Sequence, residues 1–270
     1  MKKGGNMKIE DIAEKLNILG DYLGVRDISS LTPEALYEKY GVPKADVLVL
    51  FGGSILQGGD EMGKAIENDI ASSYIIVGGE GHTTETLRRR MNEEYPGIET
   101  AGLSEAECYE RYISSLYGVK ADYLETKSTN CGNNITYLLS LLEKKNIPHR
   151  SIILMQDSTM QRRMDAGMRK YAAEDTLIIN YSSYRAHVVS TLRDLIFLHP
   201  VHGMWSMERY INLLMGEIPR LRDDANGYGP NGRNFIAHVD IPSCVEEAFA
   251  ALCAVYGDDV RTANEMYSSK

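Results

Sequence analysis

The stretch that decides the fold of this chain is Ala45-Asp46-Val47-Leu48-Val49-Leu50-Phe51, which runs directly into Gly52-Gly53. An unbroken apolar run of this length, ended by glycines, is typical of a β-strand buried on both faces. Strands of this kind lie at the centre of parallel sheets, because helices cover both faces of such sheets. We therefore expect the sheet to extend outward on both sides of residues 45–51.

Working outward, the same pattern of strand and helix returns along the chain. Strand-like segments are predicted at 73–79, 122–125, 151–156 and 176–181. Helical periodicity separates them at 60–71, 83–94, 104–117, 133–145 and 160–173, and Ser104 followed by Glu107 predicts a capping box. This alternation predicts an α/β fold, a Rossmann-like parallel sheet with helices on both faces.

The two ends of the chain differ from this central part. Residues 1–44 predict N-terminal helices packed on the core at one sheet edge, one over 7–24 and one that begins at Leu31-Thr32-Pro33. Residues 45–182 form the expected Rossmann-like core. Residues 183–270 predict a mainly helical C-terminal subdomain, with helices around 186–198, around 203–215 and after Pro242. Between them, residues 222–234 are dense in glycine and charge, which predicts a long loop with a possible role in recruiting a protein partner.

Composition narrows the class of protein. A net charge of -9 and a pI near 5.3 disfavour a nucleic-acid partner, which would need fields of Lys and Arg. The four cysteines are widely spaced and the histidines lack the paired spacing of zinc sites, so reduced thiols and no metal are expected. The N-terminal stretch lacks the apolar run of a signal peptide, and the chain has no run of about 18 apolar residues. A cytoplasmic protein without a membrane partner is the expectation.

The loops that follow the strands are the best places for a small-molecule ligand. In parallel sheets, free loop amides and helix N-termini meet at the carboxyl ends of the strands. The glycines in these loops are Gly52, Gly53, Gly78 and Gly79, which either let a ligand approach the backbone or merely form tight turns. Neither loop matches a dinucleotide fingerprint or a P-loop. Ser54, which follows the first pair, lacks the flanking pattern of a nucleophile elbow.

Charged side chains in the same loops have two interpretations each. Arg162 and Arg163 lie in the first turn of a predicted helix, so either an anionic ligand or a carboxylate such as Asp157 or Asp165 should compensate them. Glu80 and His82 could form a general base, or be adjacent by chance. Glu125 is either a ribose contact or an exposed acid at a strand end. The residues that either cap a helix or contact a ligand are Ser128, Asn130 and Asn134.

Three segments resemble a known family. They are residues 128–134, residues 156–163, and residues 216–224 leading into Gly227-Tyr228-Gly229-Pro230. In these segments the chain resembles the YdcF-like branch of a bacterial domain family that includes the SanA and ElyC envelope proteins. The resemblance implies a Rossmann-like sheet and an association with S-adenosylmethionine. The positions that match are Gly52, Gly53, Gly78, Gly79, Glu125, Ser128, Asn130, Asn134, Asp157 and Arg162. The chain departs from the wider family at Thr159, where a His is frequent, and at Cys131, where a Thr is frequent.

Two functional hypotheses follow. The leading one is a binding protein for an adenosyl- or nucleotide-type anionic ligand, with S-adenosylmethionine first among the candidates. In it the glycine pairs, Ser54, Glu80, Thr159 and the polar residues named above contact the ligand, Glu125 holds the ribose, and Arg162 and Arg163 bind the anion. The rival is a hydrolase or transferase that acts on a phosphorylated metabolite or envelope precursor. In it Asp157 or His82 is the base, and the two arginines clamp phosphate.

Overall fold

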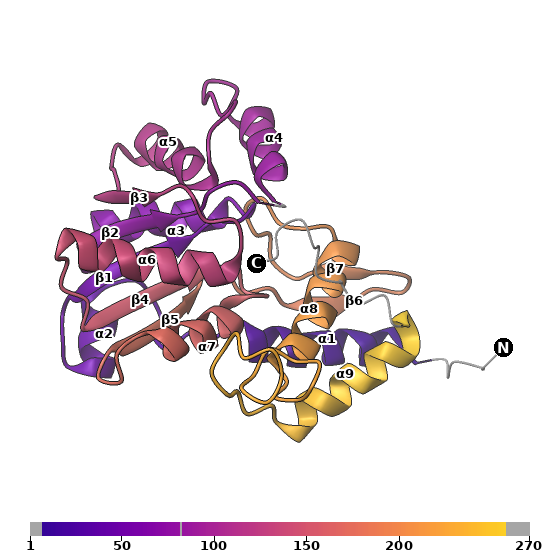
Figure 1. The fold of residues 1–270 in the computed structure, drawn as a ribbon. Coiled ribbons are helices and arrows are strands. Elements are labelled where there is room, and N and C mark those ends of the chain that lie inside the picture. Colours follow the sequence, from indigo (N-terminus) through magenta and orange to yellow (C-terminus); the bar gives the residue numbers. More distant parts are fainter. Residues whose placement is uncertain (1–6, 82, 258–270) are drawn as a thin grey trace.

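The computed structural model describes residues 7–81 and 83–257. At its centre lies a five-stranded parallel sheet in the order β3-β2-β1-β4-β5 (Figure 1). The strands are β1 (Ala45–Phe51), β2 (Ala71–Val77), β3 (Tyr123–Glu125), β4 (Ser151–Gln156) and β5 (Leu177–Ser182). The apolar run that opened the sequence analysis is the central strand, as predicted. The expected α/β, Rossmann-like fold is confirmed.

Helices connect and flank the strands. They are α1 (Ile9–Leu23), α2 (Pro33–Tyr40), α3 (Gln57–Glu67), α4 (Thr84–Glu94), α5 (Glu105–Tyr117), α6 (Cys131–Lys145), α7 (Gln161–Tyr171), α8 (Met207–Leu221) and α9 (Ser243–Tyr256). The expected caps are in place. Thr32 accepts a hydrogen bond from the amide of Ala35 at 3.3 Å, and Ser104 and Glu107 form a complete capping box at the start of α5.

Side-chain alternation along β1 explains why helices cover both faces of the sheet. Val47, Val49 and Phe51 pack in the same cluster as apolar residues of α6 and α7. Leu48 and Leu50 point to the opposite face and pack with residues of α2, α3, α4 and α5. Because successive side chains of a strand point to opposite faces, an uninterrupted apolar run supplies both cores at once. In Figure 1, α6 and α7 cross in front of the strands.

A second core lies beside the sheet and contains both ends of the described chain. The apolar face of α1, which includes Leu16, Leu19 and Leu23, packs with α8 and α9 rather than forming a separate layer on a sheet edge (Figure 1). Ile55 and Tyr184, which follow β1 and β5, also belong to this core. The N-terminal helix and the C-terminal helices therefore meet at the loops that follow the strands.

The helix expected around 186–198 is wrong. These residues form an antiparallel hairpin of β6 (Val188–Ser190) and β7 (Leu195–Phe197). The side chain of Thr191 accepts a hydrogen bond from the amide of Asp194 at 3.0 Å, and the amide of Thr191 donates to the carbonyl of Asp194 at 2.7 Å. This closed turn ends any helical periodicity, and the β-branched residues before it favour a strand.

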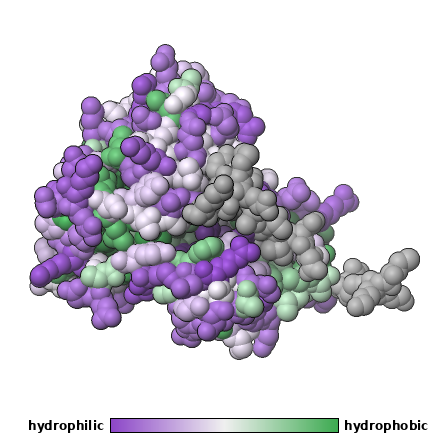
Figure 2. All heavy atoms as spheres, in the orientation of Figure 1, coloured by the Kyte–Doolittle hydropathy of each residue, from purple (hydrophilic) through white to green (hydrophobic). Residues whose placement is uncertain are grey.

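The surface in the orientation of Figure 2 is covered mostly by hydrophilic residues, with apolar residues confined to patches between them. Within residues 7–81 and 83–257, none of the helices is both long and apolar enough to cross a membrane.

Candidate functional site

The strand ends lie side by side, as the site prediction requires. Phe51 pairs with Val77, and Val77 pairs with Glu125, so three of the strands end at the same level. On the other side, Gln156 pairs with Ser182 at the ends of β4 and β5. The direction of the chain across the sheet reverses between β1 and β4, which is the switch point where parallel sheets bind ligands.

Glu105, a residue that the sequence analysis missed, explains two of the four glycines. A Cβ atom on Gly52 would lie 2.5 Å from the Oε2 atom of Glu105, and one on Gly78 would lie 3.0 Å from its Cβ atom. Neither glycine has a positive φ, so conformational freedom is not the reason for its presence. The strand-end glycines make room for the side chain of Glu105 at the start of α5.

The second glycines of the two pairs, Gly53 and Gly79, have different surroundings. A Cβ atom on Gly79 would lie 2.3 Å from the carbonyl oxygen of Ser128, so the backbone of the 126–128 turn fills this space. At Gly53, the nearest described atom is Oε1 of Gln156 at 3.7 Å, an ordinary van der Waals contact. Of the four glycines, Gly53 is therefore the one whose missing side chain leaves space that a ligand could use.

Glu105 is buried at the start of α5, and the residue is only 7% exposed. Its Oε1 atom accepts hydrogen bonds from the hydroxyls of Thr83 and Thr84 at 2.7 and 3.0 Å. Burial raises the pKa of Glu105 to about 7, although the two hydroxyls and Arg88 act in the opposite direction. The site thus contains a carboxyl group that can change its charge near neutral pH.

Glu80, one half of the predicted pair with His82, contacts an arginine in the described chain. Its side chain is 67% exposed and forms an ion pair with Arg88 at 2.7 Å. His82, the expected partner, lies outside the described residues. The described contacts of Glu80 are therefore those of a surface acid.

Asp157, the other candidate base, is fully engaged as a hydrogen-bond acceptor. Its Oδ1 atom accepts from the amide and hydroxyl of Thr159, at 2.8 and 2.7 Å, and from the hydroxyl of Tyr184 at 2.7 Å. Its Oδ2 atom accepts from the indole of Trp205 at 2.9 Å. These four donors join the end of β4 to the C-terminal part of the chain through one buried carboxylate.

Ser54 and Arg90 lie at the end of β1. Ser54 is completely buried, and its hydroxyl has no hydrogen-bond partner among the described residues. Its carbonyl accepts a hydrogen bond from Arg90 at 2.7 Å. Arg90 also donates to the carbonyls of Gly203 and Met204, and burial lowers the pKa of its guanidinium. The sequence analysis did not identify Arg90, whose role here is to hold the 203–204 backbone against the strand end.

His202 fixes the same segment to the core through two carboxylates. Its Nδ1 atom lies 2.6 Å from Oδ2 of Asp60, and its Nε2 atom lies 2.7 Å from Oε2 of Glu94. Tyr112 and Tyr117 donate hydrogen bonds to the other oxygen of Asp60. Burial alone would lower the pKa of His202, but the hydrogen bonds and charges of the two acids outweigh it and raise the pKa.

Glu125, the predicted ribose contact, and the asparagines Asn130 and Asn134 mostly stabilise local structure. Glu125 accepts hydrogen bonds from the amides of Lys127 and Ser128 at 2.7 and 3.2 Å, and so closes the turn after β3. Asn130 caps α6 by accepting from an amide three residues later at 3.0 Å. Asn134 is buried on the same helix. Helix capping, one of the two interpretations that the sequence left open, therefore accounts for Asn130.

Arg163 is buried against an acid from a distant helix. Its Nε and Nη2 atoms lie 2.5 and 3.0 Å from the two carboxylate oxygens of Glu217 in α8, and the side chains are 11% and 1% exposed. Burial alone would lower the pKa of Arg163, but the neighbouring Cys131 and Glu217 raise it. A carboxylate thus compensates Arg163, although neither Asp157 nor Asp165 supplies it.

Arg162 lies in a different environment, on the wall of a cavity of about 430 Å³. Its Nε atom donates to the carbonyl of Tyr22 at 2.5 Å, and its guanidinium lies 4.0 Å from the centre of the Tyr22 ring. Asp165, one of the two expected partners, pairs with Arg169 instead at 3.0 Å. Among the described residues, none forms an ion pair with Arg162.

Two further arginines line this cavity, and the sequence analysis identified neither. Arg26 donates to the carbonyl of Ser182 at 2.7 Å and lies 4.0 Å from the centre of the Tyr181 ring, while Arg185 is exposed. No described carboxylate forms an ion pair with Arg26 or Arg185 either. The residues that line the cavity are Gly20, Asp21, Gly24, Val25, Arg26, Ser158, Arg162, Arg185 and Ala186. We call this hollow the arginine cavity.

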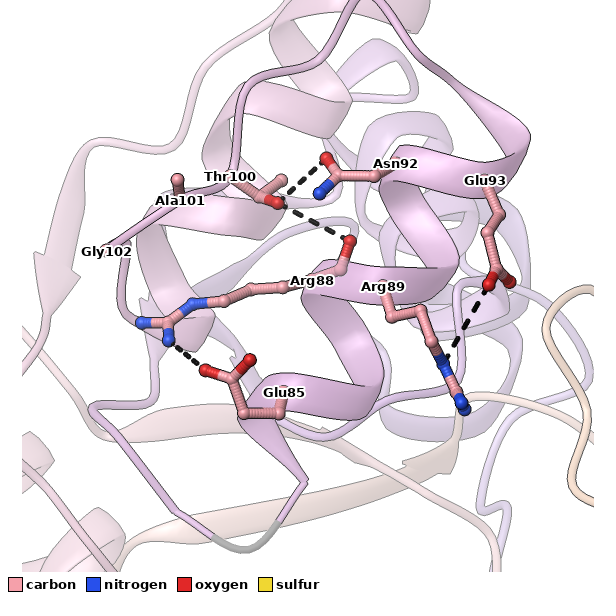
Figure 3. Close-up of a pocket in the computed structure, with 8 residues that line it drawn as sticks. All are labelled: Glu85, Arg88, Arg89, Asn92, Glu93, Thr100, Ala101 and Gly102. Atoms are coloured by element: carbon pink, nitrogen blue, oxygen red, sulfur yellow. Dashed lines mark hydrogen bonds and ion pairs between the residues drawn. The ribbon is translucent and has the colours of Figure 1, made fainter.

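A second hollow, of about 550 Å³, lies on the outer side of α4 (Figure 3). Its two cations are already compensated, because Arg88 pairs with Glu85 and with Glu80, and Arg89 pairs with Glu93. It contains none of the predicted site residues. It is the larger hollow, but the arginine cavity is the one with uncompensated charge.

The loop at 222–234 is held by hydrogen bonds within it and to residues outside it. Asp223 accepts from the amide of Asn231 at 2.6 Å and from His238 at 2.8 Å. Asp224 accepts from two amides inside the loop, those of Asn226 and Gly227, at 2.9 Å each. A protein partner at this loop stays a prediction.

A comparison of the chain with models of known protein families finds no match. The fold and the site define an α/β protein with a Rossmann-like sheet and a cationic cavity beside its strand ends. In the part of the chain that the structure describes, no group of three or more His, Cys, Asp and Glu side chains is placed to hold a metal ion.

Proposed function

We propose that this protein binds a small anionic ligand of the adenosyl or nucleotide type in the arginine cavity. One observation carries the proposal. Arg26, Arg162 and Arg185 surround one cavity, and no carboxylate of the described chain pairs with any of them. Arg26 and Arg162 are partly buried, and an unpaired cation in such a position is unfavourable unless an anion accompanies it.

The position of the cavity supports the same function. Ser158 and Arg162 follow β4, and Arg185 follows β5, so the cavity lies at the carboxyl ends of two adjacent parallel strands. Arg162 occupies the first turn of α7, where the positive end of the helix dipole disfavours a cation and favours a bound anion. A volume of about 430 Å³ is within the range of small-molecule sites.

S-adenosylmethionine is the candidate that the resemblance to YdcF-like proteins suggests, and phosphorylated nucleosides are the candidates that the charge suggests. Asp21 in the cavity wall can accept hydrogen bonds from ribose hydroxyls. The proposal is for binding, because four protein donors already occupy the carboxylate of Asp157, one of the two candidate bases. A hydrolase or transferase activity stays a prediction of the sequence. The YdcF-like relationship and a cytoplasmic location stay predictions of the sequence.

Isothermal titration with S-adenosylmethionine, ATP and a sugar nucleotide tests the proposal. We expect at least one to bind, and we expect Arg185→Ala to weaken that binding about tenfold or more. Arg185 makes no described side-chain contact that its loss would break, so the variant should fold normally. Arg89→Ala is the matched control, because Arg89 is an exposed arginine outside the cavity. No heat from any ligand with folded protein, or equal weakening by both variants, would overturn the proposal.

A further inference from the structure

We infer that the ligand of the arginine cavity carries a phosphate or diphosphate group with at least two negative charges, and that S-adenosylmethionine is not its natural ligand. The inference rests on the proposed function and names the chemical class that the cavity selects. Three guanidinium groups and the single carboxylate of Asp21 line the cavity, which leaves a formal charge of +2.

Charge is the first step of the argument. S-adenosylmethionine has an ammonium group, a sulfonium group and one carboxylate, so its net charge is +1 and adds to that of the cavity. A phosphate monoester or a diphosphate brings about two negative charges or more and neutralises it. Like charges within a few ångströms repel even where solvent screens them, so the cavity discriminates between the two classes.

The donors are arranged for forked recognition. Arg162 and Arg26 each use their Nε atom on a backbone carbonyl, those of Tyr22 and Ser182. Within residues 7–81 and 83–257, no residue accepts a hydrogen bond from their terminal nitrogens or from Arg185. Paired terminal N–H groups match the spacing of phosphate oxygens, which a single ammonium cannot reproduce.

The two inner guanidiniums are also held in place before any ligand binds. The guanidinium of Arg162 stacks on Tyr22, and that of Arg26 stacks on Tyr181, each 4.0 Å from the ring centre. Burial lowers the pKa of Arg26, and the charge of Arg185 adds to this effect; Tyr181 and Glu61 act in the opposite direction without reversing it, so the guanidinium carries a desolvation cost. A multivalent anion removes this cost, and fixed donors lose little entropy on binding it.

Titrations with adenosine, AMP, ADP and S-adenosylmethionine test the inference on the full chain. We expect affinity to rise in the order adenosine, AMP, ADP, with S-adenosylmethionine at least tenfold weaker than ADP. Arg185→Ala should weaken ADP about tenfold and leave adenosine unchanged, and Arg185→Lys should restore only part of the loss. Circular dichroism of each variant checks that it is folded.

Asp21→Asn gives a second readout of opposite sign. The substitution removes the like charge but keeps an oxygen that can accept from a ribose hydroxyl, so ADP should bind more tightly to the variant. If Asp21 instead holds the ammonium group of S-adenosylmethionine, the variant should lose that ligand. S-adenosylmethionine or adenosine binding as tightly as ADP would overturn the phosphate class while the proposed function stands. Failure of every compound to bind the folded protein would overturn both.

Discussion

Glu105→Gln should stabilise the protein strongly near pH 8 and much less near pH 5. The substitution keeps the shape of a side chain that packs against Gly52 and Gly78 but removes its ability to ionise. The hydroxyls of Thr83 and Thr84 can rotate to suit the amide, because each is both a donor and an acceptor. The variant therefore isolates the cost of a buried negative charge.

The sign follows from the raised pKa of Glu105. Between the ordinary value of 4.5 and about 7, the folded protein keeps a proton on Glu105 that the unfolded chain has released. The free energy of unfolding of the wild type therefore falls as the pH rises through this window, and it levels off above about pH 7. The interval between the two values corresponds to about 3 kcal/mol, the upper bound for the advantage of the variant at high pH.

Urea denaturation at about pH 5 and pH 8, followed by circular dichroism, measures this difference. Glu93→Gln is the matched control, because Glu93 is an exposed acid on α4 whose ion pair is worth little. The reasoning fails if Glu105→Gln is less stable than the wild type at the higher pH. It also fails if the two proteins differ by the same amount at both pH values.

Two further predictions concern ion pairs that join distant parts of the chain. Glu217→Ala should lower the free energy of unfolding by about 3–5 kcal/mol, because it leaves the buried Arg163 without a partner. The double variant with Arg163→Met should recover part of this loss in urea denaturation, and a loss below about 1 kcal/mol for Glu217→Ala would refute the assignment. His202→Gln should destabilise the protein more at about pH 6 than at pH 9. The raised pKa of His202 means that its bonds to Asp60 and Glu94 stabilise the fold at low pH and weaken as the pH rises through that pKa. Equal losses at both pH values would contradict this.

Local patterns predicted the sheet and most of the helices. The run at 45–51 identified the central strand because both of its faces are buried, and Ser104 with Glu107 identified the start of α5 because a capping box is a local interaction. The hairpin at 188–197 was missed because its short strands carry no clear alternation, so the closed turn at Thr191 decided the structure.

Long-range contacts were beyond the reach of the sequence alone. The analysis identified Arg162 as a candidate, but it could not find Arg26 and Arg185, which reach the same cavity from separate segments. It attributed the strand-end glycines to a ligand or a turn, whereas Glu105 from a distant helix fills the space beside two of them. Likewise nothing near Arg163 in the sequence indicates that Glu217 compensates its charge.

The arginine cavity is assembled from the end of α1, the start of α7 and the residues after β5, so it exists only while the N-terminal helix is docked. A ligand held there links that helix to the sheet. At a concentration one hundred times its dissociation constant, it would add about 2.7 kcal/mol to the free energy of unfolding. Undocking of α1 exposes the core it shares with α8 and α9 to proteases. A bound ligand should therefore slow the proteolysis of α1 and of the core that it shares with the C-terminal helices.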